Sequence, residues 1–549
     1  MRGQELFWKY KQKKTAYMIT IINKRNLIGL SFIICYLSFS AALTSCNDWL
    51  DVLPNNEQVT DDYWKSKEDV EAVIASGYYY MRQAVPTFIK WGELRGGTIY
   101  TTNTSDSKLQ DFNMLPSNSL CDWATIYKVI GMANSVIMYA PKVDDDTYYD
   151  AIRNSHLAEA YFMRAYCYLL LVKNFKEVPL VLTAYVNDNA AFDLAKSSEQ
   201  EIIAQIKEDV KTALETGAAK GTYEEEWQTK GRVTKWALYA LMADACLWSE
   251  DYDQSIAYCN MILDAQDAFR PAFMSNTNDW YTIFYPGNSN ESVLELNWDY
   301  SQNQTNNFAS LFTLTNSTLR PTSLATEKMK AETQELKDRG LTEDGRMGRM
   351  LLATYVPDNG QPIGWSNSNQ YYIWKYYGTD VPDITGGARA HQDANFIIYR
   401  VAEIMMMKAQ ALTMKGQGSW KEAVSLVNRI RNRAALGNFK DIDTQSSEAD
   451  EQISQLDELT LLEEVLNQKE MEFMAEGKRW YDLLWFGRIG NYKYKTEFIA
   501  KVIEGNQTTN QQWILSVLQD PNAWYMPINA TELYNNKLLE QNPYYGTTK

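Results

Sequence analysis

The stretch VAEIMMMKAQALTMKGQGSWKEAVSLVNRI, at residues 401–430, says more about the fold than any other part of this chain. Its apolar residues recur at helical spacing, first through Ile404 and Leu412 and then from Ala423 to Ile430. The glycines of Gly416-Gln417-Gly418 separate the two runs, because glycine weakens a helix and favours turns. The pattern therefore predicts two helices joined as a hairpin.

A second stretch, residues 234–263, has the same layout. One predicted helix ends near Ser249-Glu250-Asp251, and another follows from Tyr252, which holds the place that Trp420 holds in the first stretch. Each unit is about 30 residues long, close to the tetratricopeptide period of about 34. Such hairpins cannot bury their apolar faces alone, so they stack. Residues 157–215 and 64–140 supply two looser pairs.

Local capping signals mark two helix starts. Ser198 with Glu201, and Thr460 with Glu463, have the spacing of a capping box, in which each residue bonds to the other's backbone. We therefore expect helices to begin at both places.

Residues 270–395 differ in composition from the predicted hairpins. They are rich in Asn, Gly, Ser, Thr, Pro and aromatic residues and show little helical periodicity. The pieces Val293–Trp298 and Tyr371–Tyr376 have the composition of short strands. Long irregular segments on a rigid scaffold often carry function. The fold class predicted is thus mostly α, with tetratricopeptide-like helix hairpins supporting a large loop-rich region and a few short strands.

The N-terminus resembles a lipoprotein signal. Lys24-Arg25 precede an apolar run that ends in Leu43-Thr44-Ser45-Cys46, which has the form of a lipobox. We expect cleavage before Cys46 and a lipid on that cysteine, with Met1 or Met18 as the start. The alternative is an uncleaved anchor helix with an incidental cysteine.

Charge and rare residues exclude several classes of function. Residues 1–45 hold seven basic and one acidic residue, which leaves 46 basic against 68 acidic residues and a net charge of −22 from Cys46 onward. Such a body repels phosphate backbones, so no nucleic-acid partner is expected. Only His156 and His391 are present, too few for most histidine-based zinc or nucleophilic sites, and both are interpreted as surface or capping residues.

The remaining cysteines, Cys121, Cys167, Cys246 and Cys259, lie among apolar residues and are interpreted as small buried side chains. Aromatic residues are abundant, with 17 Trp, 36 Tyr and 18 Phe. Their flat rings suit stacking on sugars, although most rings in a folded protein belong to the core. No cofactor is expected. Structural calcium is possible but has no motif to support it.

Several blocks of the sequence, in order, resemble the SusD/RagB family of outer-membrane nutrient-binding lipoproteins. The most diagnostic is Lys469–Leu483, which contains Glu476-Gly477-Lys478-Arg479. The other blocks are Leu50–Pro54, His156–Tyr168 with Val178–Leu180, Gly231–Ala240, Tyr399–Leu412, Val427–Ala434, Tyr525–Ile528 and Gln541–Tyr545. Local departures occur, such as Gly96-Gly97 after Glu93-Leu94-Arg95.

The resemblance implies a cell-surface, lipid-anchored protein of the outer membrane that captures oligosaccharides and delivers them to a SusC-type TonB-dependent transporter, without chemistry. It implies residues 1–45 as signal peptide and 46–549 as a single domain. Within that domain we expect a helical scaffold at 60–265 and 396–490 and a ligand-binding region at 270–395.

Rings in the irregular segments are the candidate ligand contacts. They are Trp91, Trp280, Trp298, Tyr300, Trp365, Tyr371, Tyr372 and Trp374. Their candidate hydrogen-bonding neighbours are Arg95, Asp299, Asn303, Asn367 and Asn369.

Three alternatives stay open. One is a peptide-binding member of the same family, another a lipid-anchored glycoside hydrolase, and the third a periplasmic scaffold. A hydrolase needs two carboxylates across a cleft. Glu470 and Glu476 are candidates by proximity, but charges at this spacing more often form structural ion pairs.

Overall fold

The computed structural model describes residues 63–185, 193–313, 317–338, 340, 352–354, 371–379, 389–506 and 510–546. Residues from Trp64 to Lys549 form one compact unit. Cys46 and the predicted signal lie outside the described residues. In the part of the chain that is described, no helix is both long and apolar enough to cross a membrane.

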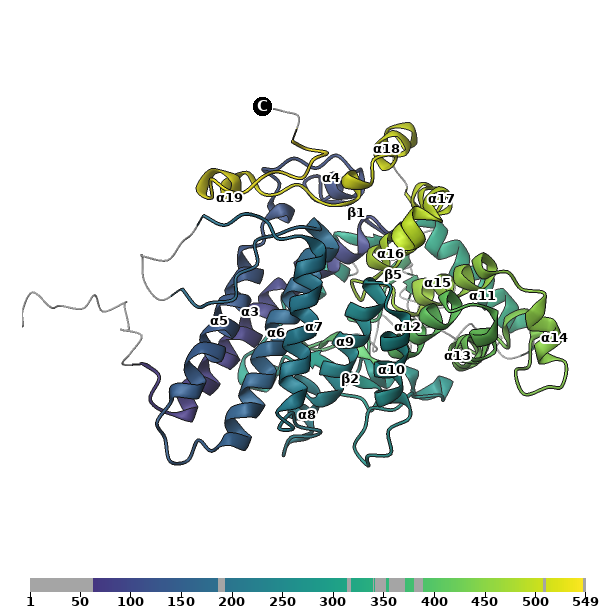
Figure 1. The fold of residues 1–549 in the computed structure, drawn as a ribbon. Coiled ribbons are helices and arrows are strands. Elements are labelled where there is room, and N and C mark those ends of the chain that lie inside the picture. The colour runs from purple at the N-terminus through teal and green to yellow at the C-terminus, as the bar shows by residue number, and fades with distance from the viewer. Residues whose placement is uncertain are drawn as a thin grey trace, which may run out of the picture. The chain divides into compact units, whose positions relative to one another are not determined.

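Four helix hairpins form the scaffold, and they stack in chain order (Figure 1). The pairs are α3 (Lys67–Glu93) with α5 (Ala124–Tyr139), α6 (Asp150–Phe175) with α7 (Glu199–Glu215), α9 (Lys235–Trp248) with α10 (Tyr252–Leu263), and α12 (Val401–Met414) with α13 (Trp420–Arg433). Neighbouring pairs pack through α5 on α6, α7 on α9 and α10 on α12. The predicted hairpins are therefore confirmed, including the two looser pairs.

The turn residues explain how each hairpin closes. Trp420 is the first residue of α13, is buried, and its indole Nε1 donates to the Thr413 carbonyl oxygen at 2.9 Å across the turn. Tyr252 is likewise the first residue of α10. The equivalence of these two rings, predicted from the sequence, is confirmed.

One capping prediction is confirmed and one is wrong. Ser198 and Glu201 form the reciprocal capping box at the start of α7. The later helix, α15 (Glu458–Glu472), instead begins two residues before Thr460, with Asp457 as its cap. The Asp457 carboxylate accepts from the Thr460 backbone N–H at 2.8 Å. Both aspartate and threonine are good N-caps, and aspartate is the better of the two, which explains why the helix begins at the earlier residue.

The strands form three separate antiparallel pairs. They are β1 (Ile99–Thr101) with β3 (Leu319–Pro321), β2 (Ser292–Leu296) with β6 (Phe396–Arg400), and β4 (Leu352–Thr354) with β5 (Tyr371–Ile373). The strands predicted near 293 and 371 are thus present. Helix α11 (Ser323–Asp338) was not predicted, because its apolar period is weak.

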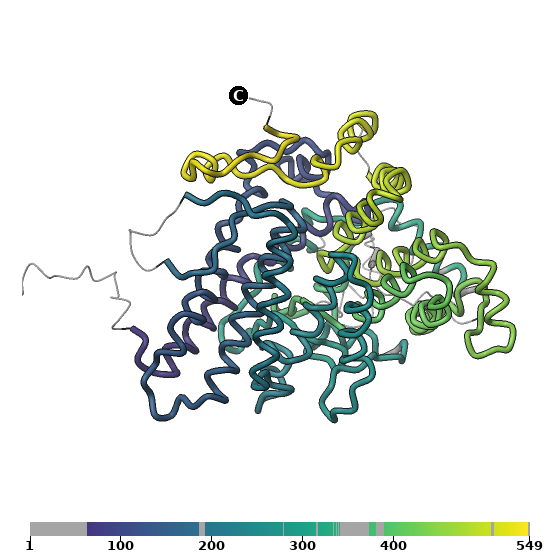
Figure 2. Tube along the Cα trace, viewed as in Figure 1, coloured from purple at the N-terminus to yellow at the C-terminus, as the bar shows by residue number. Residues whose placement is uncertain are grey.

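The remaining helices are short or C-terminal. They are α4 (Ser107–Gln110), α8 (Glu226–Gly231), α14 (Ala449–Ser454), α16 (Arg479–Tyr492), α17 (Lys495–Gly505), α18 (Gln511–Leu518) and α19 (Ala530–Asn535). The C-terminal segment returns beside residues 106–121, as Figure 2 shows. Asn506 Nδ2 donates to the Gln110 carbonyl oxygen at 2.7 Å, and the Ala530 N–H to that of Pro116 at 2.9 Å.

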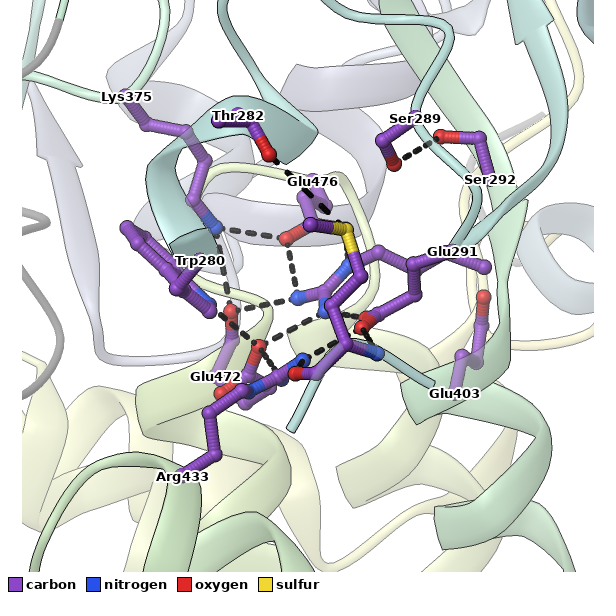
Figure 3. Close-up of polar contacts among 12 residues, drawn as sticks. Trp280, Thr282, Ser289, Glu291, Ser292, Lys375, Glu403, Arg433, Glu472 and Glu476 are labelled. Atoms are coloured by element: carbon purple, nitrogen blue, oxygen red, sulfur yellow. Dashed lines mark hydrogen bonds and ion pairs between the residues drawn. The ribbon is translucent and has the colours of Figure 1, made fainter. Parts of the chain in front are cut away.

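A buried cluster of charges fastens the irregular region to the scaffold (Figure 3). Arg400 contacts Glu291 and Glu476 at 2.9 Å and Glu472 at 2.8 Å. The cluster also contains Arg433, 2.6 Å from both Glu291 and Glu472, and Lys375, 2.6 Å from Glu476. Three cations therefore face three carboxylates, and all six side chains are at most 1% exposed.

Burial by itself raises the pKa of Glu476, but the charges of Arg400 and Lys375 outweigh it and hold that pKa below its usual value. The following residue, Gly477, has a φ of +73°, and a Cβ on it would lie 2.9 Å from the Phe88 carbonyl oxygen. A Cβ on the neighbouring Gly92 would lie 1.8 Å from the Gly477 carbonyl oxygen, so both positions need glycine. The block Lys469–Leu483 is therefore a structural element of the core.

The cysteine prediction is confirmed, since Cys121, Cys167, Cys246 and Cys259 are buried and free. The interpretation of His156 as a surface or capping residue is wrong. His156 lies within α6 and is buried, with Nε2 2.8 Å from Glu71 and Nδ1 3.1 Å from the Tyr148 hydroxyl. A histidine is accommodated there because both ring nitrogens have partners.

Candidate functional site

A cavity in the core, between α6, α9 and α12, is too small for a sugar. It has a volume of about 60 Å³ and is lined by buried charged residues such as Lys173, Asp244 and Lys469. Ligand sites usually enclose about 300–1,000 Å³, whereas this volume suffices for a few water molecules. This cavity is therefore not a glycan site, and open surfaces of the described residues are considered next.

The β2–β6 ribbon creates such a surface. Leu296 at the end of β2 pairs with Phe396 at the start of β6. Because the strands are antiparallel, the residues after 296 and those before 396 leave the ribbon at the same end. The loop Asn297–Gln304 is thereby placed beside residues 389–395. The Asn306 backbone N–H donates to the Gln392 carbonyl oxygen at 2.8 Å and connects the two segments.

Two rings stack at this end of the ribbon. The Tyr300 and His391 rings have centroids 3.6 Å apart and planes inclined by 6°. Tyr300 is 46% exposed and His391 is also exposed, so the pair lies open to solvent. Stacking one ring on the other fixes the orientation of both and presents a flat aromatic face.

Trp298 and Arg82 lie next to this pair. The guanidinium of Arg82, from α3, lies 5.8 Å from the centre of the half-buried Trp298 ring. It also donates to the Asn297 carbonyl oxygen at 3.0 Å and to Gln304 Oε1 at 2.8 Å. Arg82 thus holds both ends of the loop. Tyr79, one turn earlier on α3, is 49% exposed.

The loop is supported from below by buried polar residues. Asn395 accepts the Trp298 backbone N–H at 3.2 Å and donates to Glu295 at 2.8 Å. Glu295 also accepts from Ser292 and from the Asn288 backbone. Burial raises the pKa of Glu295 in spite of these donors. The loop is therefore preorganised, since its backbone is fixed before any ligand arrives.

On its other side the loop contacts α8. Asn297 Nδ2 donates to the Trp227 carbonyl oxygen at 3.1 Å, and the Trp227 ring is 53% exposed. The exposed Asp299 carboxylate accepts from the Ser301 hydroxyl and backbone, and these bonds lower the pKa of Asp299. We call the set Tyr79, Arg82, Trp227, Trp298, Asp299, Tyr300 and His391 the aromatic platform.

The structure divides the predicted ligand residues. Trp298, Asp299 and Tyr300 come together in the platform, and the exposed Asn303 lies in the same loop. Trp365, Asn367 and Asn369 lie outside the described residues, as do the side chains of Tyr371 and Tyr372, whose backbones form β5.

Three of the predicted rings are core residues, so their prediction as ligand contacts is wrong. Trp91 and Trp374 are 0% exposed and Trp280 is 2% exposed. The Trp91 and Trp280 indoles donate inside the protein, to the Leu120 carbonyl oxygen at 2.8 Å and to Glu472 at 3.2 Å. Arg95 is also buried, donating to Asn174 and to the Trp524 carbonyl oxygen. Large apolar rings gain more by burial than by exposure.

The sequence reasoning missed Arg82, Tyr79 and Trp227 and treated His391 only as a surface residue. Arg82 and Tyr79 lie in an ordinary helical period, so nothing local distinguishes them. Trp227 follows three glutamates and has no motif. The one available signal was for His391, which lies in the predicted ligand-binding region a few residues before the scaffold segment predicted to begin at residue 396.

The carboxylates of the diagnostic block do not form a catalytic pair. Glu470 is 1% exposed at its side chain and contacts Lys328 at 2.7 Å and Arg479 at 2.8 Å. Glu476 is enclosed in the buried cluster. Both carboxylates therefore form structural ion pairs, as predicted, but with partners distant in sequence and not with charges at helical spacing. Both are buried away from a sugar. Among the described residues, no group of three or more His, Cys, Asp or Glu side chains is arranged to hold a metal ion.

Comparison with known proteins covers both halves of the chain. A family model described as the SusD family matches residues 279–545, and a second, described as starch-binding associating with outer membrane, matches residues 48–247. A SusD-like protein of Formosa agariphila is 24% identical over 94% of this chain and 99% of its own length. A SusD-like protein of Bacteroides ovatus is 23% identical over 84% of this chain and 85% of its own length.

Solved structures share the fold. A SusD superfamily protein from Bacteroides vulgatus superposes with a TM-score of 0.67 at 21% identity, covering 88% of this chain and all of that one. A laminarin-binding SusD-like protein superposes with a TM-score of 0.62 at 17% identity, covering 87% of this chain and 100% of that one. Because SusD family models match both halves of the chain, residues 48–247 and 279–545, the chain belongs to the SusD family.

Proposed function

We propose that this protein binds a glycan at the cell surface and delivers it to a SusC-type TonB-dependent transporter, without chemistry. The observation that carries the proposal is the solvent-exposed stack of Tyr300 on His391 beside Trp298 and Arg82. Flat rings stack on the apolar faces of sugar rings, and guanidinium and carboxylate groups pair with hydroxyls. The rigid loop beneath them reduces the entropy lost on binding.

The lipid anchor and the membrane face belong to the same proposal. We infer that Cys46 carries the lipid and that the protein lies on the outer face of the outer membrane. The family description of association with the outer membrane supports this inference. The net charge of −22 from Cys46 onward makes an anionic ligand unfavourable, because like charges repel.

Calorimetry on residues Asn47 to Lys549 tests the binding step. Laminari- and malto-oligosaccharides are suitable first probes, since one similar structure is described as laminarin-binding and one matching family as starch-binding. We expect saturable binding that Tyr300→Ala weakens by about 0.5–1.5 kcal/mol. Tyr534→Ala removes a ring that is 75% exposed on α19 and serves as the matched control, with no change expected.

The same samples test the alternatives. Chromatography of the sugars after incubation should recover them intact, and shortened products would contradict the non-enzymatic proposal. Binding of peptides with no binding of any sugar would favour a peptide-binding member of the family.

The delivery step needs the full chain in cells. A tagged protein should copurify with a TonB-dependent transporter from the outer membrane, and Cys46→Ala should release it into soluble fractions. Retention of the Cys46→Ala protein in the membrane would contradict the lipid anchor, and absence of a transporter from the purified material would contradict delivery.

A further inference from the structure

The scaffold carries a second concave surface near the aromatic platform. A groove of about 660 Å³ lies between residues 220–224 and residues 267–269, with Trp236 of α9 among its lining residues. This volume lies within the range of about 300–1,000 Å³ that small-molecule ligand sites occupy. The groove is about ten times larger than the internal cavity, and it is open to solvent.

Both walls of the groove are tied to the start of α9. The Lys235 backbone N–H donates to the Lys220 carbonyl oxygen at 2.8 Å, and the Trp236 indole donates to that of Gly221 at 3.0 Å. On the other wall, Lys235 Nζ donates to Asp267 at 2.8 Å. The groove is therefore held open by bonds within the protein and does not need a ligand to form it.

The lining combines an exposed ring with balanced charges. Phe269 is 72% exposed at one wall, on a turn closed by the Arg270 N–H and the Asp267 carbonyl oxygen. Lys220 and Lys235 are matched by Glu224 and Asp267, so the groove has no net charge. Exposed glutamates continue from the wall at residues 225 and 226. This chemistry suits a neutral ligand with an apolar face and many hydroxyls, and it disfavours an anion.

Helix α8 links the groove wall to the platform. Tyr223 in the groove wall is four residues before Trp227, so the two Cα atoms are at most about 14 Å apart. Trp227 in turn accepts from Asn297, and its ring is more than half exposed. Exposed aromatic residues thus occur in the groove at Phe269, on α8 at Trp227 and in the platform at Tyr300.

We propose that the groove is a second subsite for the same neutral glycan, so that the protein binds an extended chain that crosses α8. Units near one end of the chain contact the platform at Tyr300, and units farther along contact Phe269. The preferred ligand is then an oligosaccharide longer than the platform alone can cover. This inference rests on the proposed function, and it adds the length of the substrate to it.

The test is calorimetry with ladders of laminari- and malto-oligosaccharides of increasing length. For the wild type we expect affinity to rise again at lengths beyond those that saturate the platform. Phe269→Ala should remove this second rise, weakening the longest ligands by about twofold to tenfold and leaving the shortest unchanged. Tyr300→Ala should weaken every length, and Tyr534→Ala none. Phe269 and Tyr534 are both at least 72% exposed, so neither variant is expected to unfold the protein.

Hydrogen exchange gives a second readout on the wild type. Long oligosaccharides should protect backbone amides at residues 218–227 and 264–270, and short ones should protect only the platform. Two results together would overturn the second subsite and leave the proposed function intact. Phe269→Ala would bind every length with wild-type affinity, and long oligosaccharides would not protect residues 264–270 of the wild type. Failure of the wild type to bind any ladder would overturn both proposals.

Discussion

Replacing Arg400 by methionine tests whether the buried charge cluster holds the irregular region to the scaffold. Arg400 uses its whole guanidinium: Nε and Nη2 donate to Glu476 at 3.0 and 2.9 Å, Nη1 reaches Glu291 and Glu472, and Nη2 also donates to the Glu472 carbonyl oxygen at 3.0 Å. Its side chain is 0% exposed. Methionine is long and flexible enough to occupy most of the vacated volume.

The expected loss of stability follows from the charge balance. Without Arg400, the carboxylates of Glu291, Glu472 and Glu476 share only Lys375 and Arg433, which leaves one negative charge uncompensated among side chains that are at most 1% exposed. Removing one partner of a buried ion pair costs about 3–5 kcal/mol. We expect Arg400→Met to lower the free energy of unfolding by this amount. Arg400→Lys, which keeps the charge but has three donors, should lose less.

Urea unfolding, followed by tryptophan fluorescence and circular dichroism, measures the effect. Lys211→Met is the control, because Lys211 is 57% exposed and lies 3.7–3.8 Å from Glu208 and Glu215 on the surface of α7. Its loss should be about 0.5 kcal/mol or less. A loss for Arg400→Met as small as that of the control would refute the reasoning.

The pH dependence of the two proteins gives a stricter test. In the wild type the folded pKa of Glu476 is depressed, so its contribution to stability is present above its unfolded pKa and is lost as pH falls. In Arg400→Met, burial without the charge of Arg400 should raise the folded pKa of Glu476 above its unfolded value. The variant should therefore lose stability as pH rises from the unfolded pKa through the folded pKa. The difference in free energy of unfolding between the wild type and Arg400→Met should therefore become smaller toward acidic pH. A difference that does not depend on pH would contradict the assignment of Glu476 as the titrating group.

Further predictions concern a helix cap, an acid-sensitive pair and two aromatic residues. Asp457→Ala should destabilise the protein by about 0.5–2 kcal/mol, because Asp457 is the cap of α15, and Thr460→Ala should destabilise it by less. Urea unfolding measures both losses, and a larger loss for Thr460→Ala would identify Thr460 as the cap. Hydrogen bonds and charge from His156 and Arg232 outweigh burial and lower the pKa of Glu71 to about 2. The stability that Glu71 contributes is present above its unfolded pKa of about 4.3 and should be lost as pH falls toward 2. The acid-unfolding curve of Glu71→Gln should lack this component, and an unchanged curve would contradict it. Trp374→Ala should cost about 3–5 kcal/mol, because the ring is fully buried, whereas Tyr300→Ala should change stability by about 0.5 kcal/mol or less. Equal losses for these two variants would contradict the division of the rings into core and platform.

The helical scaffold was predictable because its signals are local. Helical periods, the turn rings Tyr252 and Trp420, and the capping box at Ser198 each depend on residues within a few turns of one another. The error at α15 has the same origin, since Asp457 and Thr460 are both acceptable caps and the sequence does not choose between them.

The candidate site was only partly predictable. Trp298 and Tyr300 were expected to contact ligand and lie in the platform, whereas Trp91, Trp280 and Trp374 were expected there and lie in the core. A tryptophan in an irregular segment has the same sequence context in both cases. Its exposure depends on which distant residues pack against it, and those are not encoded nearby.

By itself the sequence determined the stacked hairpins, the short strands near 293 and 371, the buried cysteines and the membership of the family. Only the tertiary structure decided which rings face the solvent and that Tyr300 stacks on His391. The physical reason is that β2 and β6 pair across about a hundred residues of intervening chain. Helical periodicity is satisfied within one segment, but an aromatic platform built from α3, the loop after β2, the segment before β6 and α8 exists only once that long-range pairing has formed.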